Sequence, residues 1–180
     1  MKLTQNKGMA IGFMILLMVA STTISGIMKV NSLAKNVNQE FIVGEENDGL
    51  SISRDLSTRV TRAKNILSIA KNYISESDSD FSNAQSCISV LAQSESKSEL
   101  YQANQDLQAS IDSIYSRLLE MDITSKNVQS LKEEKSIFDN AMNTISYDPY
   151  NTLVSEYEEE TNTIPGNFFK LFSSKVEYFK

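Results

Sequence analysis

Carboxylates are the most concentrated side chains of this sequence that could do chemistry. Glutamates gather at 156 and 158–160, and a second pair is Glu133 and Glu134. Carboxylates hold metal ions inside helical bundles when they face inward together with histidines at Glu-x-x-His spacing. The sequence has no histidine, and consecutive glutamates point in different directions around a helix. We therefore expect solvated acidic faces, and the sequence predicts no metal and no cofactor.

One thiol and one lysine are the other reactive groups at unusual positions. Cys87 lies beside an apolar helical stripe, and no basic neighbour in the sequence favours its thiolate, so we expect a buried small hydrophobe. Lys135 interrupts an apolar stripe, and it should either snorkel at a bundle edge or pair with an acid. No P-loop, glycine-rich fingerprint or nucleophile–base pair is visible. The sequence therefore predicts a protein that is not an enzyme.

The overall charge and the residue counts exclude further classes of site. There are 17 basic and 23 acidic side chains, so the formal net charge is −6. Nucleic-acid-binding proteins cluster positive charge, and we therefore expect no nucleic-acid partner. One cysteine excludes an intramolecular disulfide, and the lack of histidine excludes Cys/His zinc patterns and histidine triads.

An apolar segment near the N-terminus predicts contact with a membrane. Residues 8–28 carry no charge. At about 1.5 Å per residue this segment reaches roughly 30 Å, the thickness of a hydrocarbon core. We predict a single transmembrane anchor whose partner is the lipid bilayer. Residues assigned to this span include Gly8, Phe13, Leu16, Leu17, Val19, Ile24 and Met28.

Two properties of this segment stay open. It could instead be a signal peptide, cleaved near Ala20 or Ser25, which would leave a secreted protein. Its orientation is also undetermined, because two lysines flank the segment on each side and the positive-inside rule depends on an imbalance.

Apolar residues after the anchor recur in steps of three and four, which is typical of helices that pack as in coiled coils. Such stripes must be buried on one another, and short connections favour antiparallel neighbours. We predict an all-α fold in which an N-terminal transmembrane helix precedes an elongated antiparallel bundle of about four helices, the first continuous with the membrane helix. The expected domains are an anchor at 1–28, the bundle at 29–164, and an aromatic tail at 165–180 that packs on the bundle or the membrane. The stripes are Leu56, Val60, Ala63, Leu67, Ala70 and Ile74; Phe81, Ala84, Ile88 and Leu91; Leu100, Leu107, Ile111, Ile114, Leu118 and Met121, with polar Asn104; and Val128, Leu131, Phe138, Met142 and Ile145, with Lys135.

Polar clusters predict where the helices begin and end. Residues 44–49 form a turn signal, and 94–98 form a weaker break that a helix could bridge. The serine-rich stretch 75–98 reads as a poor core and a solvated end of the bundle. The segment 164–167 should stop the last helix. Candidate capping residues are Asp78 or Asp80, Thr124 or Ser125, and Pro149 in the first turn of the last helix.

The C-terminal third carries a motif that resembles the LemA family. It consists of Tyr150-Asn151, Val154, Tyr157, Ile164-Pro165-Gly166-Asn167, Lys170-Leu171-Phe172 and Tyr178-Phe179. The resemblance implies a bacterial single-pass membrane protein with a mostly antiparallel helical bundle. It implies no activity, because none is established for that family.

The signature residues have a structural and a functional interpretation. Tyr150, Asn151, Val154 and Tyr157 share one helix face, which should pack the last helix on the bundle with Asn151 hydrogen-bonded across it, or should bind a partner. The segment 165–172 could fold back over the bundle end or dock on a membrane or a partner. We take as the family signature and possible interaction face Tyr150, Asn151, Val154, Tyr157, Pro165, Asn167, Phe172 and Phe179.

Two functions of different classes fit these patterns. The first is a non-catalytic, membrane-anchored scaffold or interaction module whose partner is another protein or a second copy of the chain. The alternative is an extracytoplasmic four-helix sensor or ligand-binding bundle, which would need a separate output partner.

Overall fold

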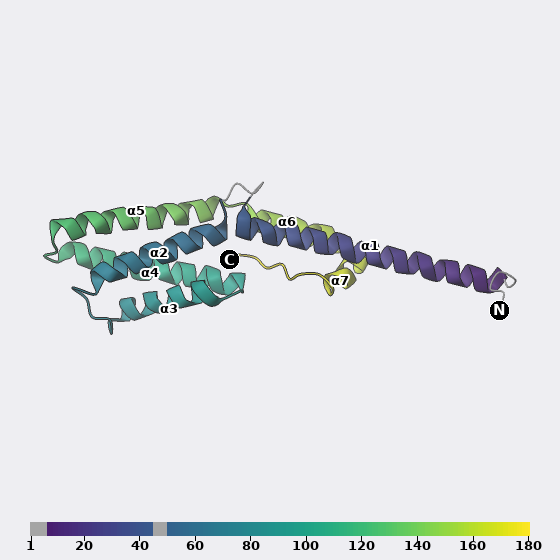
Figure 1. Ribbon diagram of the computed structural model, residues 1–180, viewed down its shortest axis with the longest axis horizontal. Helices are drawn as coiled ribbons and strands as arrows, with labels where there is room; N and C mark the ends of the chain where they lie inside the picture. The colour runs from purple at the N-terminus through teal and green to yellow at the C-terminus, as the bar shows by residue number, and fades with distance from the viewer. Residues whose placement is uncertain (1–6, 45–49) are drawn as a thin grey trace. The chain divides into compact units, whose positions relative to one another are not determined.

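The computed structural model describes residues 7–44 and 50–180, so most of the turn predicted at 44–49 lies outside the described residues. Within them the chain is helical and contains no strand, and the predicted all-α fold with an apolar N-terminal helix is confirmed (Figure 1). Gly44 follows the first helix with a φ of 90°, a conformation that favours glycine at a helix C-terminus. The helices are α1 Lys7–Val43, α2 Ile52–Ala70, α3 Ser79–Gln93, α4 Lys97–Glu120, α5 Ser125–Tyr147, α6 Tyr150–Thr161 and α7 Ile164–Lys170.

The chain forms two compact units, and each combines segments that are distant in sequence. The long-helix unit contains the described residues up to Asn38 together with Thr152–Val176. The bundle unit contains Gln39–Asn151 together with Glu177–Lys180. Helices α1 and α6 therefore contribute residues to both units. The predicted domain limits at 28/29 and 164/165 do not follow this division.

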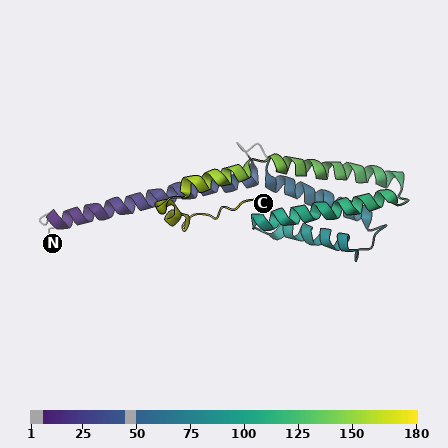
Figure 2. The same cartoon turned by 180° about the vertical axis from the view of Figure 1, so that it is seen from behind.

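The bundle unit is an antiparallel four-helix bundle of α2, α3, α4 and α5 (Figures 1 and 2). Helix α2 packs mainly on α5, and α3 mainly on α4. The core is made of the apolar stripes that face inward, and its residues include Ala63, Ile66, Leu67, Ala70, Ile74, Phe81, Ala84, Cys87, Ile88, Ala103, Leu107, Ile111, Ile114, Leu118, Ile123, Leu131 and Phe138.

The buried stripe of α2 contains Ile52, Arg59 and Ile66, which the predicted stripe lacked, and the charged Arg59 is the unexpected one. Arg59 is fully buried, whereas its neighbour Val60 is only partly buried. Together with Ile52, Leu56 and Ala63, Arg59 continues the same steps of four and three residues. The sequence pattern favoured Val60 because an apolar side chain was available one position away from the true stripe.

Polar side chains accept hydrogen bonds from backbone N–H groups in the first turns of the bundle helices. Asp78 caps α3 and Thr124 caps α5, which confirms two of the predicted candidates. Ser96 caps α4 by accepting from the N–H of Glu99, so the chain ends one helix and begins another at 94–98 instead of bridging the break. At α6, Asp148 accepts from the N–H of Tyr150 at 2.9 Å.

The serine-rich stretch 75–98 is not a solvated end, and that expectation is wrong. It contains α3, which buries Phe81, Ala84, Cys87 and Ile88 against the rest of the bundle. Small serines on the outer face do not prevent burial, because each turn of α3 still directs one apolar side chain inward.

The long-helix unit contains most of α1, with α6 and α7 beside it. Helix α6 runs antiparallel alongside α1 in both views (Figures 1 and 2). The buried residues are Val30, Ala34 and Val37 on α1, and Val154, Tyr157 and Thr161 on α6.

The segment 164–167 starts a helix instead of stopping one. Helix α6 already ends at Thr161, and Thr163 then caps α7 by accepting from the N–H of Gly166 at 3.0 Å. Pro165 lies in the first turn of α7, where a missing N–H costs nothing. The prediction of a helix end was wrong because proline is equally suited to the first turn of a new helix.

Candidate functional site

The first two residues of the predicted signature on α6, Tyr150 and Asn151, bind the C-terminal segment of the bundle unit. Asn151 donates from Nδ2 to the carbonyl oxygen of Phe179 at 2.8 Å, and its Oδ1 accepts from the N–H of Phe179 at 2.8 Å. One amide side chain therefore satisfies both backbone groups of one residue. We expected Asn151 to hydrogen-bond across the bundle, but its partner is this extended segment.

Tyr150 fixes the same segment two residues earlier. Its hydroxyl donates to the carbonyl oxygen of Glu177 at 2.7 Å. Burial, and to a smaller extent the Glu177 carboxylate, raises the pKa of Tyr150 above its usual 10.0. The phenol therefore stays protonated and keeps donating throughout the physiological range. The Glu177 carboxylate in turn accepts from the N–H of Lys97, in the first turn of α4, at 3.2 Å.

Four aromatic rings pack around this contact, and we call them the aromatic cluster: Phe41, Tyr101, Tyr150 and Phe179. The Phe41 and Tyr150 ring centroids lie 5.2 Å apart, and those of Tyr101 and Phe179 lie 5.3 Å apart, both pairs with edge-to-face geometry. The rings of Phe41 and Phe179 meet at 5.7 Å. Such pairs contribute beyond their buried area. The cluster and the backbone hydrogen bonds together hold residues 177–180 on the bundle unit.

The other two residues of the predicted α6 face belong to the long-helix unit. Val154 is fully buried there, and the Tyr157 hydroxyl shares a hydrogen bond with the Ser173 hydroxyl at 3.5 Å. The ammonium group of Lys170 lies 5.6 Å from the centre of the Tyr157 ring. The four signature residues on α6 therefore make their contacts within two units.

The remaining signature residues lie on or just after α7 in the long-helix unit. Pro165 and Asn167 are exposed, and Phe172 is also exposed. A role of Asn167 and Phe172 in contacts with a partner stays a prediction.

The residues assigned to the membrane span all lie on α1. This helix is long and apolar enough to cross a membrane, and nothing in the described chain covers its most apolar part. Gly8, Phe13, Leu16, Leu17, Val19, Ile24 and Met28 are all exposed.

A buried ionic network inside the bundle unit was missed by the sequence analysis. Arg59 donates from Nη1 to the carbonyl oxygen of Phe138 at 3.0 Å and from Nη2 to Oε1 of Gln108 at 2.8 Å. Its guanidinium carbon lies 3.8 Å from the centre of the Phe138 ring. Asn104 and Lys135, polar residues on apolar seams, were the signal that the core holds charge, but neither pointed to Arg59.

Two aspartates balance the cations of this network. Lys135 forms ion pairs with Asp112 at 2.8 Å and with Asp139 one turn later, which confirms the pairing alternative predicted for it. Burial alone lowers the pKa of Lys135, but the hydrogen bonds to Asp112 and Asp139 outweigh this and raise it. Gln108 links Arg59 to the aspartates that pair with Lys135. Its Oε1 accepts from Arg59, and its Nε2 donates to both aspartates.

Burial dominates the electrostatics of Arg59 itself. Loss of hydration lowers its pKa from 12.5 to about 10, against the attraction of Asp139 and Asp112. Arg59 therefore remains charged at neutral pH. The network joins α2, α4 and α5 and can fix their register.

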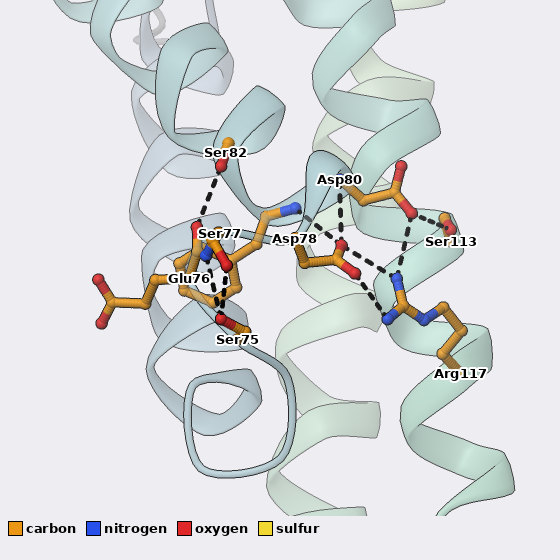
Figure 3. Close-up of polar contacts among 9 residues, drawn as sticks. Ser75, Glu76, Ser77, Asp78, Asp80, Ser82, Ser113 and Arg117 are labelled. Carbon is orange, nitrogen blue, oxygen red and sulfur yellow. Dashed lines mark hydrogen bonds and ion pairs between the residues drawn. The ribbon is translucent and has the colours of Figure 1, made fainter.

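A second charged cluster joins the start of α3 to α4 (Figure 3). Arg117 contacts both oxygens of Asp78, at 2.8 Å and 3.0 Å, and also reaches Asp80 at 3.4 Å. The hydroxyl of Ser113 donates to Asp80 at 2.6 Å. The hydrogen bond from Arg117, with those from two backbone N–H groups, outweighs desolvation and holds the pKa of Asp78 below its usual 3.8. Asp78 thus caps one helix and ties it to another.

The reactive groups considered at the outset occupy separate positions. Cys87 is buried in the core, where desolvation first and Asp106 second raise the pKa of its thiol. The glutamates of α6 at 156 and 158–160 are exposed. Over residues 7–44 and 50–180, no group of three or more Asp, Glu, Cys or His side chains could hold a metal ion.

A groove of about 490 Å³ lies on the bundle unit. Its walls come from the end of α1, the first half of α2 and the junction of α3 with α4. The lining residues include Phe41, Ile42, Ser53, Leu56, Ser57, Val60, Leu91, Ala92, Ser94, Glu95, Lys97 and Leu100.

No protein-family model, curated protein or solved structure matches this chain. The resemblance to the LemA family therefore rests on the quoted sequence motif alone.

Proposed function

We propose that this is a non-catalytic, single-pass membrane protein whose helical bundle serves as a scaffold or protein-interaction module. The proposal extends the LemA-like resemblance and, with it, a place in a bacterial cell membrane. The observation that carries it is the structure of α1. The apolar half of this helix is uncovered, and the last residues of the same helix belong to the bundle unit.

The size of the uncovered apolar surface favours lipid over water. Nine large apolar side chains are exposed between Met9 and Val19. Full transfer is worth about 1.5–3 kcal/mol for each such side chain, and because each is about half exposed, the nine together gain on the order of 10 kcal/mol in hydrocarbon. That gain is comparable with the whole folding free energy of a typical domain. A bilayer supplies the missing environment without a second protein.

A scaffold role is supported by the chemistry of the bundle unit. Its buried charges pair with one another, as Lys135 does with Asp112, and its thiol is buried. What remains outside is a helical surface with excess acid, which suits contacts with a protein partner or a second copy of this chain.

The sensor alternative is supported by one observation, the groove of about 490 Å³ on the bundle unit. This volume lies in the range of small-molecule sites, and its lining mixes apolar and polar side chains. A sensor of this kind would have its bundle outside the cytoplasm and would need a separate output partner.

The side of the membrane separates the two functions. In a Cys87→Ala background, Ser136→Cys places one thiol on the exposed face of α5. The full chain is expressed in intact bacteria and treated with a membrane-impermeant maleimide before or after lysis. The parent with Cys87 alone is the control, because its buried thiol should not react in either sample.

Each outcome decides between these functions. Labelling only after lysis, with the full-length protein in the membrane fraction, supports a cytoplasmic scaffold tethered to the bilayer. Labelling of intact cells at full length favours the sensor. A shortened band or a protein that leaves the membranes in carbonate would contradict the anchor itself.

A further inference from the structure

We propose that α7 and the two residues after it form a second membrane contact, an amphipathic element that inserts into the headgroup–acyl boundary of a phospholipid bilayer. This inference rests on the proposed anchor, because it places α7 relative to α1.

One face of α7 is apolar and uncovered. Ile164, Phe168, Leu171 and Phe172 follow the spacing i, i+4, i+7 and i+8, which puts them on one side of a helix. The helical path persists past Lys170, since the N–H groups of residues 171 and 172 bond to the carbonyls of residues 168 and 169. The exposed fractions of these side chains are 92%, 50%, 77% and 57%. Four adjacent large apolar residues at such exposure mark a contact surface and not the ordinary exterior of a soluble protein.

A contact inside the long-helix unit fixes the level of α7 along α1. The ring of Phe169 lies against Gly26, so closely that a Cβ at that position would overlap the ring. Gly26 lies two residues before the end of the apolar segment, so the distance from Gly26 to that end is about 3 Å along the helix axis. When residues 8–28 cross the hydrocarbon core, α7 therefore lies at its boundary.

The polar groups near α7 fit the same placement. Lys170 lies over the ring of Tyr157, so its charge is directed to α6 and away from the apolar face. The helix also satisfies most of its own backbone, as a segment at the edge of the hydrocarbon must. The exposed glutamates of α6 add negative charge to this unit. Insertion should therefore depend on apolar area and not on anionic lipid, and uncharged phosphatidylcholine should suffice.

Single tryptophans test this directly, because the chain has none of its own. Phe172→Trp and Phe168→Trp report on the apolar face of α7, and both sites are exposed enough to accept the larger ring. Leu17→Trp reports on the middle of the span. Thr152→Trp is the water control from the same unit, because it is exposed at the start of α6, nine residues before Thr161.

Each full-length variant is reconstituted in phosphatidylcholine vesicles whose acyl chains carry bromine near the headgroup or near the bilayer centre. We expect Leu17→Trp to be quenched most by the deep bromine. Both α7 reporters should emit at shorter wavelength than Thr152→Trp and lose most intensity to the shallow bromine.

Three results would contradict the inference, and they differ in what else they overturn. If both α7 reporters emit as in water while Leu17→Trp is quenched, the anchor stands and α7 does not insert. If the α7 reporters shift to shorter wavelength but neither bromine quenches them, protein and not lipid covers the face. If Leu17→Trp is not quenched, the anchor fails and the inference fails with it.

Discussion

The polar groups of Asn151 and Tyr150 bind the backbone of the C-terminal segment and not its side chains. Three hydrogen bonds, two from Asn151 to Phe179 and one from Tyr150 to Glu177, replace the neighbouring strand that an extended segment normally needs. This arrangement explains an asparagine next to a tyrosine at the start of α6 without any catalytic role.

The first prediction concerns this asparagine. Asn151→Ala removes one donor and one acceptor and leaves both backbone groups of Phe179 without that partner, at a cost of about 1–3 kcal/mol. We expect the amide of Phe179 to exchange with deuterium much faster, while the core of α4 is unchanged. Asn167→Ala is the matched control, since this signature asparagine is exposed. Equal exchange at Phe179 in the two variants would count against the role given to Asn151.

The second prediction concerns Arg59. Arg59→Met keeps an apolar stem of similar length but leaves the carbonyl of Phe138 and the side chain of Gln108 without their donor. We expect the free energy of unfolding to fall by about 1–3 kcal/mol, because buried acceptors lose their hydrogen-bond donor. Urea unfolding in detergent, followed by helical circular dichroism, measures this loss. Lys64→Met on the exposed face of the same helix should change it by less than about 0.5 kcal/mol. A similar small change for both would mean that the network is not stabilising.

Single residues also show where sequence reasoning fails. The apolar seam predicted that Lys135 would either snorkel or pair with an acid, and the structure chooses the pairing. Arg59 was not predictable, because Val60 offers an equally regular apolar pattern and only tertiary packing chooses between the two. The partner of Asn151 could not be predicted either, since it lies 28 residues away on a segment with no regular structure.

At the scale of helices, side-chain caps decide where each element begins. The cap of α3 also carries an ion pair, which makes its contribution dependent on pH. The pKa of Asp78 is below 3.8 in the folded protein, so its stabilising effect is complete above pH 3.8 and is lost as the pH falls through the folded-state pKa.

The third prediction follows from that linkage. Asp78→Asn retains a good N-cap but loses the charge that Arg117 contacts. We expect the variant to be less stable than the parent at neutral pH, and the difference to disappear as the pH falls below 3.8. Thermal unfolding across this pH range measures it, with Asp122→Asn at an exposed position as the control. A difference that persists unchanged in acid would show that Asp78 acts as a neutral cap only.

Elements with strong local signals were predicted from the sequence, and elements with mixed signals were not. Asp78 and Thr124 stand immediately before helical apolar patterns, and both are caps. The segment 164–167 contains proline and glycine, which can mark either the start or the end of a helix. Its role as the start of α7 depends on Thr163 and on the packing of Phe169 against Gly26, and a short window of sequence shows neither.

At the scale of the whole molecule, α1 and α6 each contribute residues to both units, and each unit combines segments that are distant in sequence. Residues 177–180 belong to the bundle unit although the 25 residues before them, Thr152–Val176, belong to the other unit. The sequence could not reveal this, because helical periodicity is local and the return of Phe179 to Phe41 and Tyr101 is a long-range contact. The predicted division at 164/165 followed composition alone.

The fourth prediction concerns the contact of Phe179 with the aromatic cluster. Phe179→Ala removes the ring that fills the aromatic cluster, where Phe179 is 3% exposed. We expect the unfolding free energy of the bundle unit to fall by about 3 kcal/mol. Phe168→Ala removes the same ring from an exposed site and should cost less than about 1 kcal/mol in detergent. Urea unfolding of both variants provides the comparison, and equal losses would show that Phe179 is not part of the folded core.

The position of Phe179 also orders events during synthesis. The ribosome releases α1 first, and the apolar segment can enter a membrane while the rest of the chain is still being made. Phe41, Tyr101 and Tyr150 are translated before Phe179, so their cluster stays open until all the helices exist. Nascent chains expose such unfinished apolar surfaces to aggregation and to chaperones. Completion of the bundle unit is thus delayed until after the proposed anchor has emerged, so insertion of that segment into a membrane would precede final folding.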